Sequence, residues 1–173
     1  TSAENYGYHA QSNNWTCTNP YPGVTFCALH RQVKTTFDGQ STTEEATTYA
    51  YDAYGNITTI TQEGDPKTSG DKRTKQIRYT ANANEWIVSR LTSIVELDAD
   101  GATKLSDQRF FYDDHADLAE PPTRGNLTRV EEWLNTAQAY FGTTLAYDAY
   151  GNVTKVTDPK GHTTTLSYDP LTA

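Results

Sequence analysis

Short runs of β-branched and aromatic residues alternate with polar, glycine-containing segments along most of this chain. Runs at 47–50 and 57–61 flank one such segment, and runs at 143–146 and 153–157 flank another. Two runs of strand formers joined by a short segment with Asp and Gly are typical of a β-hairpin. The pattern therefore predicts an all-β chain built of antiparallel hairpins.

The polar segments between these runs repeat. The letters YDAYGN stand at residues 51–56 and again at 147–152, which indicates an internal repeat. In each copy we expect the Asp side chain to accept backbone N–H groups and the next two residues to form the centre of a type I turn. The Gly should then adopt the left-handed conformation, which a Cβ disfavours. Tyr51 and Tyr147 should pack on the sheet face.

Weaker copies extend the repeat. The Gly-Asn half recurs at 125–130 and, without Gly-Asn, at 90–94, while a separate Asp-x-x-Gly turn stands at 98–101 and 158–161. The repeated unit is a Tyr-Asp turn, a strand, an Asp-x-x-Gly turn and a second strand. The predicted repeat residues are Tyr51, Asp52, Gly55, Asn56, Tyr112, Asp113, Gly125, Asn126, Tyr147, Asp148, Gly151, Asn152, Tyr168 and Asp169.

These letters resemble the YD repeat of the RHS (rearrangement hot spot) family, whose relatives include the B and C components of bacterial toxin complexes and the teneurins. The resemblance covers roughly residues 37–173 and implies a long β-ribbon that spirals into a hollow, extracellular or cell-surface shell. In toxin members the shell encloses a cytotoxic segment, and in teneurins it serves adhesion. Such shells need more units than stand here, so we expect this chain to belong to a longer polypeptide or to self-associate through sheet edges.

Residues 1–30 are the least repetitive part, and we expect an irregular N-terminal segment over 1–36, followed by a YD-repeat hairpin region over 37–173. Cys17 and Cys27 bracket a turn-rich stretch, and a disulfide between them would contribute about 3 kcal/mol on the loop-entropy model. Two free thiols are an alternative, and so is a zinc site with His9 and His30, although no Cys-x-x-Cys pair is present. A nucleophilic pair of Cys27 and His30 would lack an orienting third group.

Composition narrows the possible partners. The chain is 35% hydrophobic, carries a net charge of −8 and has a pI near 4.9. No basic patch is present for a phosphate backbone, which disfavours nucleic acid. No stretch approaches the roughly 18 apolar residues of a membrane span.

Three local features have competing interpretations. The segment 113–124 gathers acidic residues and His115, but it lacks the glycine-hinged spacing of a calcium loop, so we predict a solvated loop. Apolar residues over 130–141 have helical spacing, yet the flanking repeat copies favour two strands. Trp86 is expected to anchor its loop into the sheet.

The strand after each Gly-Asn poses a further question. Ile57 and Ile60 are three residues apart and would face opposite sides of a flat strand. Either a bulge follows the turn or both sheet faces are partly covered. Three of the chain's Asn-x-Thr glycosylation acceptors are the repeat's own Asn and Thr, so the repeat explains them without a glycan.

The recurring residues are turn and strand formers, so the sequence predicts a non-catalytic structural segment without catalytic residue, cofactor or metal. The alternative is an extracellular binding or adhesion module that recognises carbohydrate or protein through an aromatic-rich sheet surface. Toxin members of the resembled family carry a self-cleaving aspartyl protease motif, Asp-Pro-x-Gly-Leu. Here Asp158-Pro159-Lys160-Gly161 is followed by His162, so the motif does not carry over.

Overall fold

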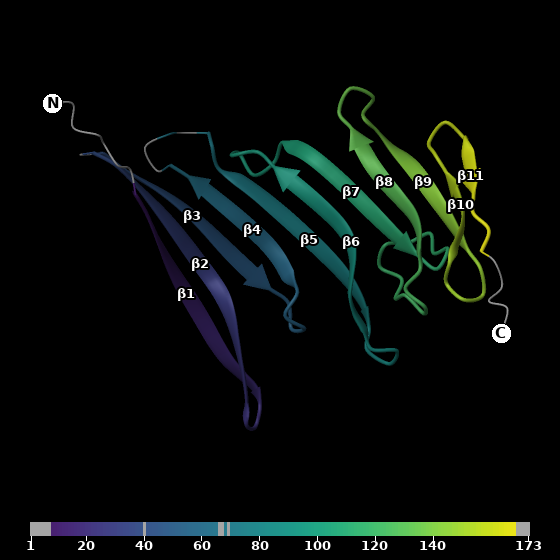
Figure 1. Ribbon diagram of the computed structural model, residues 1–173, viewed down its shortest axis with the longest axis horizontal. Coiled ribbons are helices and arrows are strands. Elements are labelled where there is room, and N and C mark those ends of the chain that lie inside the picture. The colour runs from purple at the N-terminus through teal and green to yellow at the C-terminus, as the bar shows by residue number, and fades with distance from the viewer. Residues whose placement is uncertain (1–7, 40, 66–67, 69, 169–173) are drawn as a thin grey trace. The chain divides into compact units, whose positions relative to one another are not determined.

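The computed structural model describes residues 8–39, 41–65, 68 and 70–168. Within these residues every regular element is a strand and none is a helix. The strands are β1 (Tyr8–Tyr21), β2 (Val24–Asp38), β3 (Ser41–Tyr51), β4 (Ile57–Gly64), β5 (Arg73–Asn82), β6 (Ile87–Leu97), β7 (Lys104–Tyr112), β8 (Leu127–Leu134), β9 (Ala139–Tyr147), β10 (Val153–Thr157) and β11 (Thr163–Thr165). Neighbouring strands in the antiparallel sheet are consecutive in the sequence (Figure 1), which confirms the predicted all-β hairpin fold.

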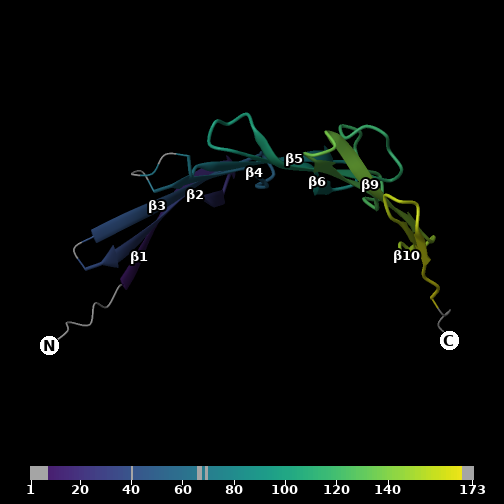
Figure 2. The same cartoon turned by 90° about the horizontal axis from the view of Figure 1, so that it is seen from above.

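Contacts divide the chain into two compact units. Unit 1 comprises Thr1–Gln76 with Glu96–Leu105, and unit 2 comprises Ile77–Val95 with Ser106–Ala173. Seen edge-on, the strands of each unit lie in a single layer (Figure 2). Most domains bury their apolar side chains between two layers, so a single layer leaves little fully enclosed volume. Buried apolar side chains in the described part of the chain are accordingly few: Ala46, Leu97, Phe111, Tyr112 and Pro122.

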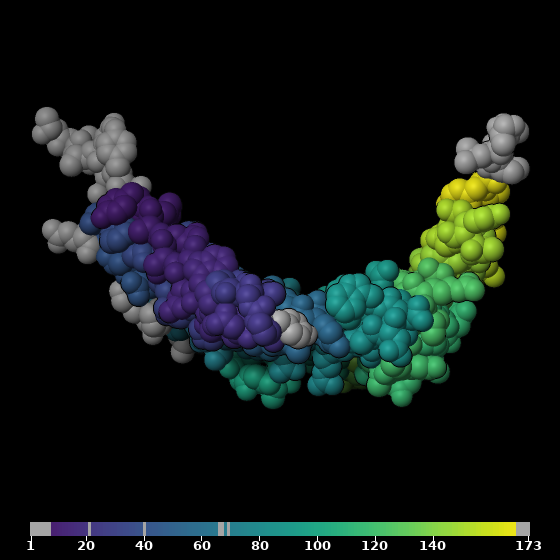
Figure 3. Space-filling model, turned by 90° about the horizontal axis from the view of Figure 1, so that it is seen from below, coloured from purple at the N-terminus to yellow at the C-terminus, as the bar shows by residue number. Residues whose placement is uncertain are grey.

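The expectation of an irregular segment over 1–36 is wrong for the residues that the structure describes. β1 and β2 form a long hairpin whose register runs from Tyr8 opposite Phe37 to Tyr21 opposite Val24. The expected boundary after residue 36 therefore falls inside β2. Described side chains of β1 are exposed, and they form the purple surface of unit 1 in Figure 3. Because neither face of this strand is covered, its sequence lacks the alternation that marks a half-buried strand.

The segment 130–141 is strand, as predicted, and the helical alternative is wrong. β8 and β9 join through a turn at 135–138, and Trp133 lies directly opposite Tyr140. The two rings meet edge to face with centroids 5.0 Å apart. In a single layer both faces carry half-buried apolar side chains, so the spacing of apolar residues no longer identifies the element.

Trp86 does not anchor its loop, contrary to the prediction. It ends the turn at 83–86 with φ 56°, and its side chain is 79% exposed. The Trp86 N–H donates to the Ala83 carbonyl at 3.3 Å, so the backbone closes the turn without help from the indole.

Candidate functional site

The turn at 51–56 is closed by both the backbone and the side chain of Asp52. The Asp52 N–H donates to the Asn56 carbonyl at 2.9 Å, and the Gly55 N–H donates to the Asp52 carbonyl at 3.2 Å. Asp52 Oδ1 accepts the N–H groups of Tyr54 and Asn56, and Oδ2 accepts the Asn56 side-chain amide, each at 2.9 Å. Gly55 has φ 85°. This is the turn that the sequence predicts, with glycine at the left-handed position.

The copy at 147–152 is built from the same bonds. Asp148 Oδ1 accepts the N–H groups of Tyr150 and Asn152, Oδ2 accepts the Asn152 amide, and Gly151 again has φ 85°. The hydrogen bond from the Asn152 side chain contributes most to holding the pKa of Asp148 below its ordinary value, and backbone N–H groups add to it. Identical letters thus produce identical local structure in units 1 and 2.

A β-bulge follows each Gly-Asn. Thr58 is the extra residue in the first repeat, because the residues on either side of it pair with the facing strand and it does not. The same register shift singles out Thr128 and Thr154. The bulge answers the question raised by the spacing of Ile57 and Ile60. In the repeat's Asn-x-Thr letters, the threonine is therefore the bulge residue.

The structure also assembles one turn from two halves that lie apart in the sequence. The Tyr-Asp half at 112–113 meets the Gly-Asn half at 125–126, and the Asp113 N–H donates to the Asn126 carbonyl at 2.9 Å. Asp113 Oδ2 accepts the N–H groups of residues 123–125, and Oδ1 accepts that of Asn126. Burial alone would raise the pKa of Asp113, but these backbone N–H groups outweigh it and lower the pKa. Residues between the halves are therefore an insertion into a single turn.

This inserted loop is packed rather than merely solvated. It stands out from the layer of strands in unit 2 (Figure 2). The Asn82 side chain on β5 donates to the Pro122 carbonyl at 2.9 Å, the Thr80 hydroxyl donates to the Ala119 carbonyl at 3.2 Å, and Pro122 is fully buried. Among the described residues no group of three or more His, Cys, Asp or Glu is placed to hold a metal ion.

The tyrosine of each Tyr-Asp pair bonds to the preceding strand. The hydroxyl-to-carbonyl bonds are Tyr51 to Leu29 at 2.9 Å, Tyr112 to Leu91 at 3.0 Å, Tyr147 to Leu127 at 2.7 Å and Tyr168 to Val153 at 3.0 Å. For Tyr147 the β8–β9 ladder ends at Arg129 opposite Thr144, so the hydroxyl supplies a donor where the two strands separate. We call these bonds tyrosine clamps. Burial raises the pKa of Tyr51, Tyr112 and Tyr147, which keeps their hydroxyls protonated donors.

The tyrosine clamps also show that a weak sequence copy of the repeat has the same structure as the strong ones. Leu91 accepts from Tyr112 as Leu127 accepts from Tyr147, so the segment 90–94 is a repeat copy although it lacks Gly-Asn. Asp169, the partner of Tyr168, lies outside the described residues.

The Asp-x-x-Gly turns lie at the opposite ends of the strands and use similar bonds. Asp158 Oδ1 accepts the N–H groups of Lys160 and His162 at 2.8 Å, and Oδ2 lies 2.8 Å from His162 Nδ1. The His162 side chain contributes most to lowering the pKa of Asp158. In the turn at 98–101, Asp100 bonds the Thr103 hydroxyl and N–H, which lower its pKa to about 2. Asp158 thus has a complete structural role as a turn residue.

Residues 147–172 match the family model named RHS Repeat. This segment is an RHS repeat. The described part of the matched segment, 147–168, holds one Tyr-Asp turn, β10, an Asp-x-x-Gly turn, β11 and the next tyrosine clamp, which is one whole RHS unit. A search among curated proteins finds no match. Among the described residues the structure has no helix that could span a membrane.

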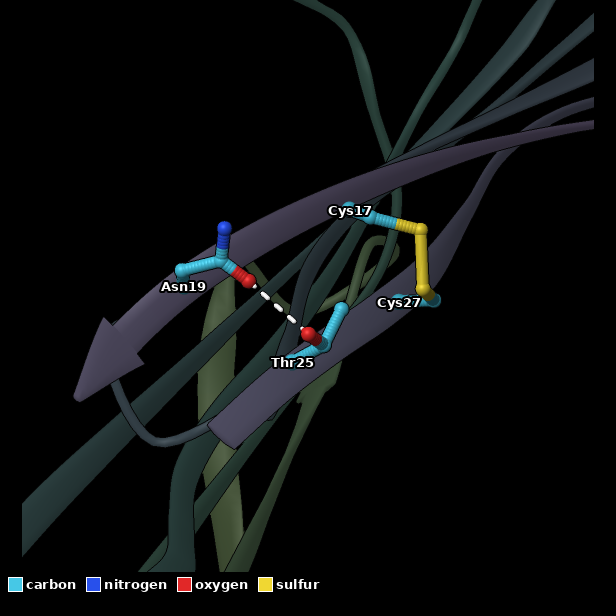
Figure 4. The surroundings of a disulfide bond; sticks show 4 residues. All are labelled: Cys17, Asn19, Thr25 and Cys27. Carbon is cyan, nitrogen blue, oxygen red and sulfur yellow. Dashed lines mark hydrogen bonds between the residues drawn. A yellow bond between two sulfur atoms is a disulfide. The ribbon is translucent and has the colours of Figure 1, made fainter. Parts of the chain in front are cut away.

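The N-terminal hairpin contains a disulfide. Cys17 and Cys27 lie directly opposite each other on β1 and β2 and are joined, and the Thr25 hydroxyl donates to Asn19 Oδ1 at 2.9 Å nearer the turn (Figure 4). Bonded sulfurs are neither thiolate ligands nor nucleophiles. The structure therefore rules out, in this oxidised form, the zinc and Cys–His alternatives.

Two concave surfaces lie near the Tyr-Asp turns. In unit 1 a groove of about 800 Å³ lies between the tip of the β1–β2 hairpin and the first Tyr-Asp turn, and its walls include Phe26, Tyr49, Tyr51 and Tyr54. In unit 2 a smaller cavity of about 320 Å³ lies beside the inserted loop, over β8, β9 and β10. Neither surface is evident in the sequence, because each joins residues far apart in the chain.

Proposed function

We propose that this chain is a non-catalytic structural segment of an extracellular YD-repeat polypeptide, in which each repeat adds two strands to a growing sheet. The observation that carries this proposal is that the repeat's aspartates and clamp tyrosines are hydrogen-bonded to the backbone. The aspartates of the turns accept backbone N–H groups, and the tyrosine hydroxyls donate to backbone carbonyls. Among the described residues, the turn aspartates and the clamp tyrosines of the repeat thus serve the backbone.

Two further observations support the extracellular setting and the larger polypeptide. Disulfides persist in oxidising compartments, and the Cys17–Cys27 bridge favours one of these. β1 and β11 each have a single neighbour in the strand order, so each presents an open edge. Open edges pair readily with further strands. We propose that these edges join the rest of the polypeptide or a second copy of the chain.

The proposal is tested on the native polypeptide. Surface, secreted and cytosolic fractions of the producing cells are probed with an antibody to this segment, under reducing and non-reducing conditions. We expect a product larger than 19.2 kDa in the secreted or surface fraction, with the Cys17–Cys27 bridge intact by peptide mapping. A cytosolic product with reduced cysteines contradicts the extracellular part.

The absence of catalysis needs a separate measurement. Purified chain is assayed against panels of glycoside, ester, peptide and phosphate substrates. Activity that disappears in a folded point variant at one cleft would overturn the structural assignment.

A binding module is the second candidate, favoured by the aromatic groove of unit 1. Phe26 is 42% exposed and Tyr54 is 51% exposed, so their faces are open to a ligand. Aromatic rings with a polar edge suit sugar rings and protein surfaces. The repeat offers a matched control, because Tyr150 occupies the equivalent turn position in unit 2 and lies outside the groove.

We expect a glycan array or pull-down to find a ligand whose binding is lost in Tyr54→Ala and kept in Tyr150→Ala. Equal loss in both variants would show that the groove is not the site. Binding by neither the parent chain nor its variants leaves the structural role as the function.

A further inference from the structure

The cavity of unit 2 has a wall with unusual chemistry for an acidic protein. Three side chains on it are basic: His115 from the inserted loop, Arg129 from β8 and Lys155 from β10. Asp114 is the acidic residue on the same wall. The chain as a whole carries −8 at pH 7 with His neutral, and on the same count this wall has two basic groups, Arg129 and Lys155, and one acidic group.

The strand register places the cavity-lining residues of β8, β9 and β10 next to one another. Thr144 lies directly opposite Arg129 on one side and Thr157 on the other, and Ala146 lies opposite Lys155. Directly opposite residues share a sheet face, and so do residues two apart along a strand. Arg129, Thr144, Thr157 and Lys155 therefore line one face, in two adjacent rows.

The inserted loop closes the other side of the cavity. The Asp114 N–H donates to the Thr128 hydroxyl at 2.9 Å, which fixes the loop to the bulge residue of β8. The His115 N–H donates to the Tyr112 carbonyl at 2.9 Å, and its Nε2 lies 3.5 Å from Glu120 Oε1. The loop that interrupts the repeat thus becomes one wall of a concave site.

Hydrogen bonding on this wall is incomplete. In the described part of the chain, the buried side-chain nitrogens without a hydrogen-bond partner are His115 Nδ1 and Arg129 Nε, and both residues line this cavity. Arg129 Nε lies 3.4 Å from Glu131 Oε1, within ion-pair range but without a hydrogen bond, and its guanidinium stacks on Phe111 at 3.8 Å. Both atoms have almost no accessible surface, so a ligand in the cavity would not reach them, and they show only that the side chains of this wall are incompletely paired within the protein.

Two further groups are available to a ligand. Within the described residues, the Lys155 ammonium has no ion-pair partner and the Asp114 carboxylate accepts no hydrogen bond. The Lys155 ammonium suits a carboxylate. The Asp114 carboxylate would repel a doubly charged anion and would accept a hydrogen bond from a hydroxyl group.

We propose that this cavity binds a small hydroxylated carboxylate of the uronic-acid class. Lys155 receives the carboxylate, Arg129 adds positive charge behind it, and His115 offers a ring nitrogen to the ligand. Asp114 and Thr144 receive the ligand hydroxyls. A volume of about 320 Å³ is near the lower end for ligand sites and suits a single sugar ring.

The test is a titration of the whole chain with sodium glucuronate, followed by amide chemical shifts. We expect saturable shifts centred on residues 128–129, 144–146 and 155–157. Lys155→Gln should weaken binding roughly tenfold, as loss of a charged hydrogen bond does. Lys160→Gln is the matched control, because it removes the same charge from the neighbouring exposed turn, and it should leave binding unchanged.

A second pair of variants separates hydroxyl recognition from charge. Thr144→Val should weaken glucuronate roughly threefold. Thr143→Val, a neighbour on the opposite face, should not weaken it. Glucose, which lacks the carboxylate, should bind at least tenfold more weakly than glucuronate.

Three outcomes overturn the proposal. They are an absence of saturable shifts with glucuronate, equal affinity in Lys155→Gln and the parent chain, and tighter binding of inorganic phosphate than of glucuronate. The last would identify a general anion site. None of these outcomes bears on the structural role, which does not depend on this cavity.

Discussion

The hydroxyl of Tyr147 donates to the carbonyl of Leu127 across a distance of 2.7 Å, from the end of one strand to the beginning of the preceding one. The next residue, Asp148, accepts N–H groups from the turn that follows. The tyrosine of the pair thus bonds to the preceding strand, and the aspartate bonds to the turn that follows. A single-layer sheet has little core to hold its strands, and this pair supplies polar bonds at each corner instead.

Loss of one tyrosine clamp should measurably lower the free energy of unfolding. Tyr147→Phe keeps the ring and leaves the Leu127 carbonyl without its donor, which should lower the free energy of unfolding by about 1 kcal/mol. Tyr150→Phe is the control, because that side chain is 90% exposed. Urea denaturation of both variants makes the comparison, and equal midpoints would deny the clamp a role in stability.

Much of the repeat could be predicted from sequence because its information is local. Asp52 and Gly55 act within a few residues of each other, so their letters suffice to predict the turn. The clamp of Tyr51 on Leu29 spans 22 residues, and sequence reasoning missed it. A signal existed, since the repeat tyrosine recurs together with an apolar residue about 20 positions earlier, at Leu29, Leu91 and Leu127.

Other errors have a common physical source. The β1–β2 hairpin and the exposed Trp86 both belong to surfaces that a single layer leaves uncovered. Hydrophobic patterning indicates which side chains must leave water, so it carries little information where neither face is buried. The wall of the unit 2 cavity depends on strand register and an inserted loop, and its residues have no shared motif.

Acid should weaken the fold through the turn aspartates. The folded pKa of Asp148, Asp158 and Asp113 lies below the ordinary value, and that of Asp100 is about 2. Stability from these groups is present above the unfolded pKa of about 4 and is lost as pH falls through the folded values. Thermal unfolding from pH 7 to pH 2 should therefore show a falling midpoint below about pH 4.

Asp148→Asn should flatten this acid dependence, and Asp114→Asn should not, because the Asp114 carboxylate takes no part in a turn. Parallel curves for Asp148→Asn and the parent chain would exclude Asp148 as a contributor.

Alkali should weaken the clamps. Burial raises the pKa of Tyr51, Tyr112 and Tyr147 above that of an unfolded tyrosine, which is about 10. Stability from these phenols is complete below about pH 10 and is lost as pH rises through the folded pKa. The chain can be titrated with alkali while ultraviolet absorbance follows tyrosine ionisation and circular dichroism follows the sheet. Ionisation of the clamp tyrosines and loss of sheet should occur over the same pH range. Ionisation of these phenols without loss of stability would contradict the expectation.

The two identical turns allow a paired glycine experiment. Gly55 and Gly151 both have φ 85°, so alanine should cost about 1–2 kcal/mol at either position. A Cβ on Gly55 would also lie 3.1 Å from the Phe26 ring, whereas on Gly151 its nearest neighbour would be 4.0 Å away. Gly55→Ala should therefore destabilise more than Gly151→Ala in urea. If the two glycine substitutions destabilise equally in a Phe26→Ala background, the difference comes from this ring. Equal destabilisation in the parent chain would show that the contact with Phe26 has no effect on stability.

The disulfide should matter only near the tip of the first hairpin. The β2–β3 ladder ends at Arg31 opposite Thr48, so residues between 15 and 29 pair only with each other. Closing this short loop should contribute about 3 kcal/mol against local opening. Replacing both Cys17 and Cys27 by Ser should speed hydrogen exchange in this tip by about two orders of magnitude, since 1.4 kcal/mol corresponds to tenfold. Amides of β8 and β9 are the internal control, and faster exchange there would mean that the bridge stabilises more than the hairpin that contains it.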